Sequence, residues 1–381
     1  MKILFSSIVA LLLAPTLAHA QQLRGMYVDG FASILGNTTA ENELLFYAQT
    51  NDINYLALYD LWPVHQTYNL TTANTCTVLS SFIARAHTQY GITQIGATGE
   101  NLWFFENIVS AYQNTHPNAD ERFDLYNVEF EFWNTASVEP GGVLCTDYLE
   151  GAGLPCTVDG AFTYWMDMVE GVNTNAHAHN AISEVYVGWF DDIQGAQFAH
   201  AVDRILLHDY VTNEANMFPY ISGRLVNLAT GPTPTNVAVL FSAEPDFLGP
   251  YLQTNTLDAP FAVVNTQLSE LDAAWTANIN LIGYQWFAYS FMPAQPITGI
   301  SEVQLSNGQV YPNPTAGIVH LRDANAVEAT VYSTLGQQLM QFKTTSQTTI
   351  DLNTLPSGVY VLAVQKADGK TSYERVLLLG E

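Results

Sequence analysis

Two glutamates stand two positions apart in the stretch FDLYNVEFEFWN, which covers residues 123–134. Glu129 and Glu131 alternate with apolar residues, and Asn127 stands two positions before the first of them. Side chains two apart on a β-strand point to the same side. The spacing therefore predicts one strand face that carries both carboxyls and the amide, backed by an apolar face. Paired carboxyls in such a place are suited to general acid–base chemistry.

The chain around this stretch alternates strand-like apolar runs with helical patterns from Arg24 to about Pro293. Eight strand–helix units match the count and length of a (β/α)8 TIM barrel. The alternative is an open doubly wound sheet, but the turn DGFASILGN after the first strand is not a phosphate loop. The predicted strands cover residues 24–31, 53–61, 93–100, 123–134, 183–190, 204–211, 236–244 and 283–291.

Carboxylates gather at the predicted carboxyl ends of these strands, where a barrel of this kind carries its site. Aromatic residues are plentiful beside them, and lysine and arginine are absent from these ends. Pyranose rings stack on aromatic planes and carboxyl groups transfer the proton, so the combination predicts sugar chemistry. The candidates for substrate contact from this pattern are Asp29, Asp60, Glu100, Tyr210, Glu244 and Trp286, with Asp209 beside them.

The spacing of Asp124, Asn127, Glu129 and Glu131 resembles a known pattern. Glycoside hydrolase family 18, the chitinases and endo-β-N-acetylglucosaminidases, carries DxxDxDxE on its fourth barrel strand. In this chain an asparagine replaces the second aspartate of the pattern and a glutamate replaces the third. The resemblance extends over most of residues 24–293.

Other strands are similar to that family too. INYLALYD looks like its second strand, and IGATGE lies where its third strand ends. LLHDY is similar to its sixth-strand Tyr-Asp motif, with His208 in the tyrosine position. Trp286 stands where the family has the tryptophan that floors the sugar site.

The resemblance implies that Glu131 is the general acid that protonates the glycosidic oxygen, while the substrate's 2-acetamido oxygen attacks the anomeric carbon. Glu129 would orient that acetamide and stabilise the oxazolinium-like charge, Asn127 would hydrogen-bond Glu129, and Asp209 would hold the sugar or tune the pair. Because two carboxyls on one face do not both ionise easily, we expect a raised pKa, on Glu131. The expected activity is substrate-assisted, retaining hydrolysis of β-linked N-acetylglucosamine-containing glycans, with no cofactor and no metal ion.

Two alternatives stay open because the motif departs from the family. Glu131 and Glu244 fit the acid/base and the nucleophile of a retaining glycosidase on a non-acetylated glycan. A carboxyl separation of about 5 Å would favour that mechanism. The third interpretation is a non-catalytic, carbohydrate-binding exported protein.

The chain is strongly acidic, with a formal net charge of -25. Lysine occurs only at Lys2, Lys343, Lys366 and Lys370, so nearly all of the negative charge belongs to the first large segment. Such a surface repels phosphate backbones, which argues against nucleic acid as a partner and favours a neutral oligosaccharide or polysaccharide.

The first twenty residues predict a secretory signal peptide. They contain Lys2, an apolar core, and Ala-His-Ala before Gln21. No later segment is long and apolar enough to span a bilayer. An exported chain can form disulfides, and we expect one between Cys145 and Cys156, with Cys76 left as a buried thiol.

The composition changes after Pro296, where short strand-like runs alternate with turn signals. This block closely resembles the type A C-terminal sorting domain of the type IX secretion system of Bacteroidota, through YPNP at 311–314, YSTLG at 332–336 and LPSGVY at 355–360. The resemblance implies export through the periplasm by that machinery, then secretion or attachment to the cell surface. The predicted parts are a signal peptide (1–20), a barrel (21–297) and a small all-β sandwich (298–381).

Overall fold

The computed structural model of the chain describes residues 21–294, 310–321, 326–333, 338–343, 349–367 and 371–379. The predicted signal peptide and the predicted boundary at 297/298 lie outside these residues. The chain divides into two compact units, Met1–Ala294 and Gln295–Glu381.

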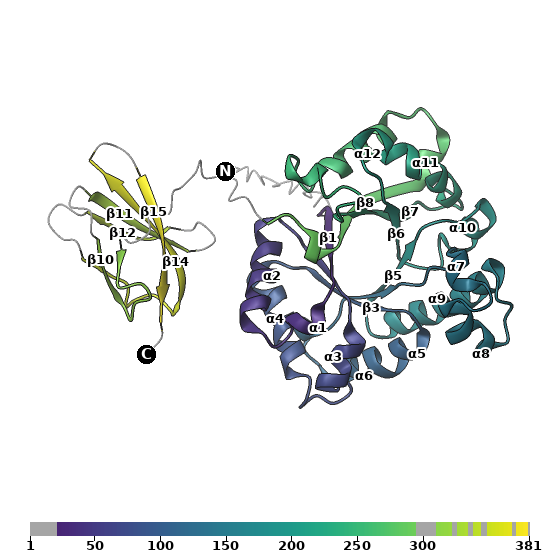
Figure 1. The fold of residues 1–381 in the computed structure, drawn as a ribbon, viewed down its shortest axis with the longest axis horizontal. Helices are drawn as coiled ribbons and strands as arrows, with labels where there is room; N and C mark the ends of the chain where they lie inside the picture. Colours follow the sequence, from purple (N-terminus) through teal and green to yellow (C-terminus); the bar gives the residue numbers. More distant parts are fainter. Residues whose placement is uncertain are drawn as a thin grey trace, which may run out of the picture. The chain divides into compact units, whose positions relative to one another are not determined.

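Eight parallel strands close into a barrel in the first unit (Figure 1). Each strand pairs with the next in the chain, and β8 closes the ring on β1 through the register Gly25↔Gln285. The predicted TIM barrel is therefore confirmed, and the open-sheet alternative is wrong. The strands are β1 (Leu23–Val28), β2 (Tyr55–Leu58), β3 (Gln94–Gly99), β4 (Leu125–Val128), β5 (Ile182–Val187), β6 (Arg204–Asp209), β7 (Thr235–Ser242) and β8 (Ile279–Phe287).

Helices surround this ring (Figure 1). The larger ones are α2 (Thr38–Thr50), α4 (Thr77–Tyr90), the continuous run α5 (Leu102–Phe104), η1 (Phe105–Val109) and α6 (Ser110–Thr115), then α9 (Val158–Ala178), α10 (Asp192–Phe198), α11 (Met217–Leu228) and α12 (Ala259–Glu270). Shorter elements occupy the loops: α1 (Phe31–Ile34), α3 (Leu61–Tyr68), η2 (Ala119–Glu121), α7 (Thr135–Val138), η3 (Cys145–Leu149), α8 (Glu150–Ala152), η4 (Glu214–Asn216), η5 (Tyr251–Gln253), η6 (Ala274–Asn278) and η7 (Tyr289–Phe291). Within the described ranges, every helix is too short or too polar to cross a membrane.

Two apolar layers hold the barrel together. The outer layer lies between strands and helices and includes Met26, Tyr126, Val128 and Trp286. The inner layer fills the barrel and includes Tyr27, Tyr55, Leu125, Tyr186, Leu206 and Leu240. Side chains alternate along each strand, so of two consecutive residues one points into the barrel and the other points toward the helices. Only the inward-pointing residues can reach the mouth.

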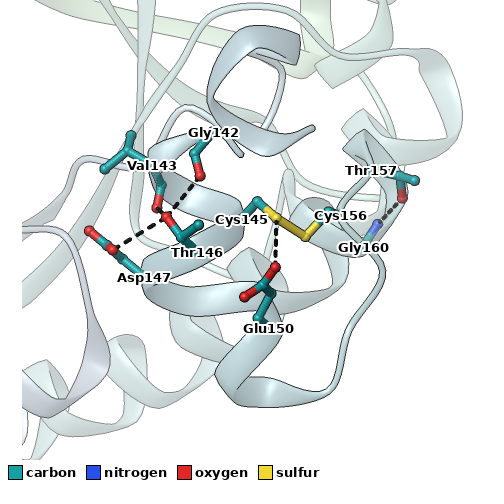
Figure 2. Close-up of a disulfide and its surroundings, with 9 residues drawn as sticks. All are labelled: Gly142, Val143, Cys145, Thr146, Asp147, Glu150, Cys156, Thr157 and Gly160. Atoms are coloured by element: carbon teal, nitrogen blue, oxygen red, sulfur yellow. Dashed lines mark hydrogen bonds between the residues drawn. A yellow bond between two sulfur atoms is a disulfide. The ribbon is translucent and has the colours of Figure 1, made fainter. Parts of the chain in front are cut away.

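The disulfide Cys145–Cys156 is present and fastens the long connection between β4 and α9 (Figure 2). The Glu150 carboxylate lies 3.8 Å from Cys145 Sγ. This trio is the one group of potential metal ligands close enough together among the described residues. Both sulfurs are bonded to each other in the disulfide, so these three residues offer no thiolate ligand to a metal ion. Cys76 is buried as a free thiol.

The second unit is an all-β sandwich. One sheet has the order β13-β10-β9 and the other the order β12-β11-β14-β15. Side chains from both sheets form a single core, among them Val319 and Ile350 from the first and Val331 and Leu362 from the second. The strands are β9 (Val310–Tyr311), β10 (Ile318–Leu321), β11 (Ala326–Ser333), β12 (Gln338–Lys343), β13 (Thr349–Asp351), β14 (Gly358–Lys366) and β15 (Thr371–Leu378).

Candidate active site

A buried ion pair lies inside the barrel below the mouth. Glu184 of β5 is fully buried and binds Arg204 Nε of β6 at 2.5 Å. The Tyr55 hydroxyl donates to Glu184 Oε1 at 2.7 Å, and Arg204 Nη1 donates to Gln94 Oε1 at 2.9 Å. A buried charge is tolerated when it is paired and hydrogen-bonded, as here. The pair therefore forms a fixed polar floor beneath the carboxyls of the mouth.

Asn127 belongs to this floor and not to the acid pair. Its Nδ2 donates to Glu184 Oε1 at 2.7 Å, and its Oδ1 accepts from the Tyr27 hydroxyl at 3.0 Å. The expected hydrogen bond from Asn127 to Glu129 is therefore replaced by these two. The reason is position, because Asn127 is fully buried inside β4, one layer below the residues that follow the strand.

Glu129 and Glu131 follow β4 directly and reach the mouth of the barrel. The Tyr186 hydroxyl donates to Glu131 Oε1 at 3.2 Å, and Asn134 Nδ2 donates to Glu131 Oε2 at 3.0 Å. The Glu129 N–H donates to the Gly99 carbonyl of β3 at 3.0 Å, which fixes its backbone. Both carboxyls therefore sit on the inner side of the ring, as the two-residue spacing predicts.

The raised pKa of the pair falls on Glu129. Burial, and then the nearby charge of Glu131, raise the pKa of the Glu129 carboxyl to about 8, while a hydrogen bond with Tyr27 lowers it. Sequence reasoning placed the raised pKa on Glu131. The difference follows from depth, because Glu129 is nearer the barrel interior, where desolvation penalises the charged form. One carboxyl of the mouth is thus protonated at neutral pH.

His208 lies beside the pair as a neutral ring. Its Nδ1 is 3.3 Å from the Tyr186 hydroxyl, and its ring stacks on Tyr210 with centroids 4.8 Å apart. Burial, with a smaller effect of Arg224, lowers the pKa of His208 to about 3. Tyr186 therefore connects Glu131 to an uncharged imidazole.

Asp209 and Trp286 do not reach the mouth. Both are fully buried and face the helix layer, since His208 and Tyr210 flank Asp209 on the inner side, and Trp286 packs on Phe241 with ring centroids 5.4 Å apart. The predicted catalytic role of Asp209 and the predicted role of Trp286 as the sugar floor are therefore corrected. The strand register turns both side chains toward the helices.

The interior position on β8 belongs instead to Phe287. Its ring lies 5.8 Å from Tyr27 and 6.3 Å from Tyr210, measured between centroids. Phe287 therefore lies on the inner side of the barrel, where sequence reasoning placed Trp286 as the floor of the sugar site.

The remaining candidates are spread around the rim. Asp29 accepts from Ser290 N at 2.9 Å and also contacts Ser290 Oγ, so it ties the end of β1 to the segment after β8. Glu244 Oε2 accepts from Ser242 Oγ at 2.9 Å at the end of β7. Asp60 and Glu100 line a pocket of about 410 Å³ over the ends of β2 and β3.

Sequence reasoning missed Glu184, Arg204 and Tyr186. A signal for the first two was present, because each is a charged residue beside a run of apolar strand residues, SEVYV and RILL. Charges in such runs are rarely buried unless they are paired. Nothing local marks them as partners, since they lie on neighbouring strands and meet only through the β5–β6 register Glu184↔Arg204.

Comparison with known proteins bears first on the tail. Residues 309–378 match the family model described as Secretion system C-terminal sorting domain. The tail is a secretion sorting domain. A curated relative, beta-agarase D of Zobellia galactanivorans, is 31% identical over 70 residues, which are 18% of this chain and 14% of the agarase. The aligned part is thus a small share of either protein.

Solved structures resemble the chain at low sequence identity and with TM-scores below 0.5. A chitinase from Bacteroides thetaiotaomicron is 10% identical with a TM-score of 0.35, over 71% of this chain and 90% of the chitinase. A candidate beta-galactosidase from Bacteroides fragilis is 10% identical with a TM-score of 0.41, over 95% of this chain and 55% of that chain. A type I 3-dehydroquinate dehydratase from Clostridium difficile is 8% identical with a TM-score of 0.38, over 67% of this chain and 95% of the dehydratase.

Proposed function

We propose that the barrel is an exported glycoside hydrolase that cleaves β-linked N-acetylglucosamine-containing glycans with retention of configuration. The observation that carries the proposal is the carboxyl pair Glu129 and Glu131 at the end of β4, of which one holds a proton at neutral pH. A general acid must be protonated at the working pH, and a second carboxylate must stabilise the cationic centre.

In this proposal the proton that Glu129 holds at neutral pH moves to Glu131 when the substrate binds, which leaves Glu129 as a carboxylate. Glu131 passes it to the glycosidic oxygen as the bond to the anomeric carbon breaks. The 2-acetamido oxygen of the substrate attacks the same carbon and forms an oxazolinium ion, which Glu129 stabilises as a carboxylate. Water then attacks the anomeric carbon, returns a proton to Glu131 and reopens the ring, so configuration is retained.

The surroundings of Glu131 support its role in proton transfer. Tyr186 and Asn134 hold one oxygen each, at 3.2 and 3.0 Å, so the carboxyl is oriented from both sides. Burial raises the pKa of the Tyr186 phenol well above its ordinary value, so it stays a hydrogen-bond donor. Within the described part of the chain, the ion pairs of arginine involve other carboxylates, including Glu184, and none involves Glu129 or Glu131.

A second candidate is direct nucleophilic attack by Glu244 on a glycan without acetamides. The observation in its favour is the placement of Glu244 after β7, where Ser242 holds one oxygen at 2.9 Å. Burial, then the charges of Glu129 and Glu244, raise the pKa of Tyr210 in the same mouth. The two mechanisms differ in which carboxylate is indispensable besides Glu131.

The test compares the full chain with Glu131→Gln, Glu129→Gln and Glu244→Gln on chito-oligosaccharides, N-glycans and non-acetylated β-glucan oligosaccharides, with products detected by mass spectrometry. We expect Glu131→Gln and Glu129→Gln each to lower kcat on the acetylated substrates by about 10²–10⁴-fold. Glu244→Gln should change it far less. Activity of the unaltered chain should fall as pH rises through about 8, where Glu129 loses its proton.

Two other outcomes would change the proposed function. Loss of activity in Glu244→Gln, on a substrate without acetamides, would replace the first mechanism by the second. Binding of a glycan without release of any product by the unaltered chain would make the barrel a carbohydrate-binding protein.

A further inference from the structure

The pocket over β2 and β3 adjoins the acid pair. Gly99 lines it, and the Gly99 carbonyl accepts the Glu129 N–H at 3.0 Å. Tyr59 also lines it, and the charge of Glu129 contributes to the raised pKa of this phenol. A ligand in the pocket therefore lies next to a ligand bound over Glu129 and Glu131.

One wall of the pocket is aromatic and open to solvent. Trp62 is 47% exposed and Trp103 is 56% exposed, and their ring centroids lie 6.2 Å apart with planes at 68°. His65 stacks behind Trp62 with centroids 5.4 Å apart and fixes that ring. Two exposed tryptophans from α3 and α5 thus meet at an angle, and each offers an aromatic face on which a sugar ring can stack.

The polar side of the pocket is acidic and incompletely paired. Asp60 and Glu100 contribute carboxylates, and none of the lining residues is lysine, arginine or histidine. Burial lowers the pKa of His65 behind the wall, so this ring adds no positive charge at neutral pH. Thr98 also lines the pocket, is only 5% exposed, and its Oγ1 has no hydrogen-bond partner. A buried hydroxyl without a partner gains a hydrogen bond when a polar ligand arrives.

We propose that this pocket binds one sugar ring of the glycan and selects a ring that carries a free 2-ammonium group over an N-acetylated one. The inference rests on the proposed function and extends it to the ring next to the one that is cleaved. An ammonium gains from the aromatic faces and from the two carboxylates, whereas acetylation removes the charge and leaves only stacking. The favoured substrate class is thus a partly deacetylated β-linked glucosamine polymer, with an acetylated ring over the acid pair.

The test measures binding by intrinsic tryptophan fluorescence on the full chain carrying Glu131→Gln, at about pH 6, where the sugar amine holds its proton. The probes are the tetramers of glucosamine and of N-acetylglucosamine. We expect the glucosamine tetramer to bind about tenfold more tightly. Adding Asp60→Asn and Glu100→Gln should bring the two affinities within about twofold of each other. Asparagine suits position 60 because Asp60 has a φ of 60°, a conformation that asparagine tolerates.

The matched control is Asp120→Asn with Glu270→Gln, which removes the same charge from exposed positions outside the pocket and should keep the tenfold preference. Trp62→Ala should weaken both tetramers. Equal binding of the two tetramers, or a preference that survives the Asp60 and Glu100 changes, overturns the inference. These readouts do not depend on cleavage, so a chain that prefers the amine but cleaves nothing would contradict the proposed function alone.

Discussion

At the scale of residues, the carboxyls of the barrel differ in how deeply they are buried, and burial shifts their pKa values. Glu129 and Glu131 stand two apart, yet depth raises the pKa of Glu129 to about 8. The same cause acts on Asp209 outside the barrel, where burial raises the pKa to about 8 and Arg224 only partly offsets it. Both Asp209 oxygens are buried without a hydrogen-bond partner. This carboxyl therefore has a cost to stability and no contact with the site.

Asp209→Asn tests that assignment. In the folded chain Asp209 keeps its proton up to about pH 8, whereas the unfolded chain releases it near pH 4, so the free energy of unfolding falls as pH rises between these values. The asparagine variant lacks this loss. We expect it to gain about 1–3 kcal/mol over the unaltered chain between pH 5 and pH 8 in urea unfolding.

Asp246→Asn, at an exposed position, serves as the control and should show no such gain. Activity of Asp209→Asn at pH 7 should stay within about threefold of the unaltered chain, because the carboxyl faces the helix layer. A loss of activity comparable with that of Glu131→Gln would restore Asp209 to the site.

At the scale of elements, the loops after β2, β3 and β4 line the proposed binding pocket beside the pair. α3 brings Trp62, α5 brings Trp103, and η3 brings Tyr148 to the same pocket. The η3 loop is closed by the disulfide Cys145–Cys156, with a sequence separation of 11 (Figure 2). The covalent link therefore holds one wall of the pocket in place.

Replacing both disulfide cysteines by serine should loosen that wall. A loop of this length loses about 2–3 kcal/mol of stabilisation when the link is removed. Because Tyr148 lies inside the loop, we expect KM for the glycan to rise about 3–10-fold with a smaller change in kcat. Cys76→Ala is the control, since this thiol is buried apart from the pocket, and it should lower stability without raising KM. An unchanged KM in the serine variant would show that the disulfide serves stability alone.

At the scale of the whole molecule, the two units have separate cores. The barrel is held by its inner and outer apolar layers, and the sandwich by a cluster of its own that includes Val331 and Leu362. The sandwich is a secretion sorting domain, which indicates export and then secretion or attachment to the cell surface. Export is thus assigned to the sandwich, and the proposed chemistry to the barrel.

Deleting residues 309–381 should separate these two roles. In a bacterium with the type IX machinery, we expect the shortened chain to stay in the periplasm, as judged by immunoblots of cell fractions. Its unfolding midpoint and its activity in cell extracts should match those of the full chain, because the barrel core does not include the tail. Glu131→Gln with the tail intact should be exported normally. Release of the shortened chain to the medium would contradict this division.

The sequence by itself determined the barrel, the sandwich and the position of the acid pair along the chain. Period-two alternation around Glu129 and Glu131 set their common face, and the turn signals of the tail marked its strands. Only the tertiary structure decided which face of the other strands points inward. Every residue of β6 is buried, so the apolar pattern cannot tell His208 from Asp209.

A strand buried on both faces carries no hydrophobic mark of its inner side, and a one-residue offset exchanges the two. The same ambiguity exchanged Trp286 and Phe287 on β8. The partnership of Glu184 with Arg204 was hidden because the two residues meet only through the β5–β6 register. The pocket likewise required three loops to meet in space, because its walls come from segments that share no local sequence signal. Closure of the ring determines which side of each strand faces inward, and it brings the loops after neighbouring strands to the same mouth.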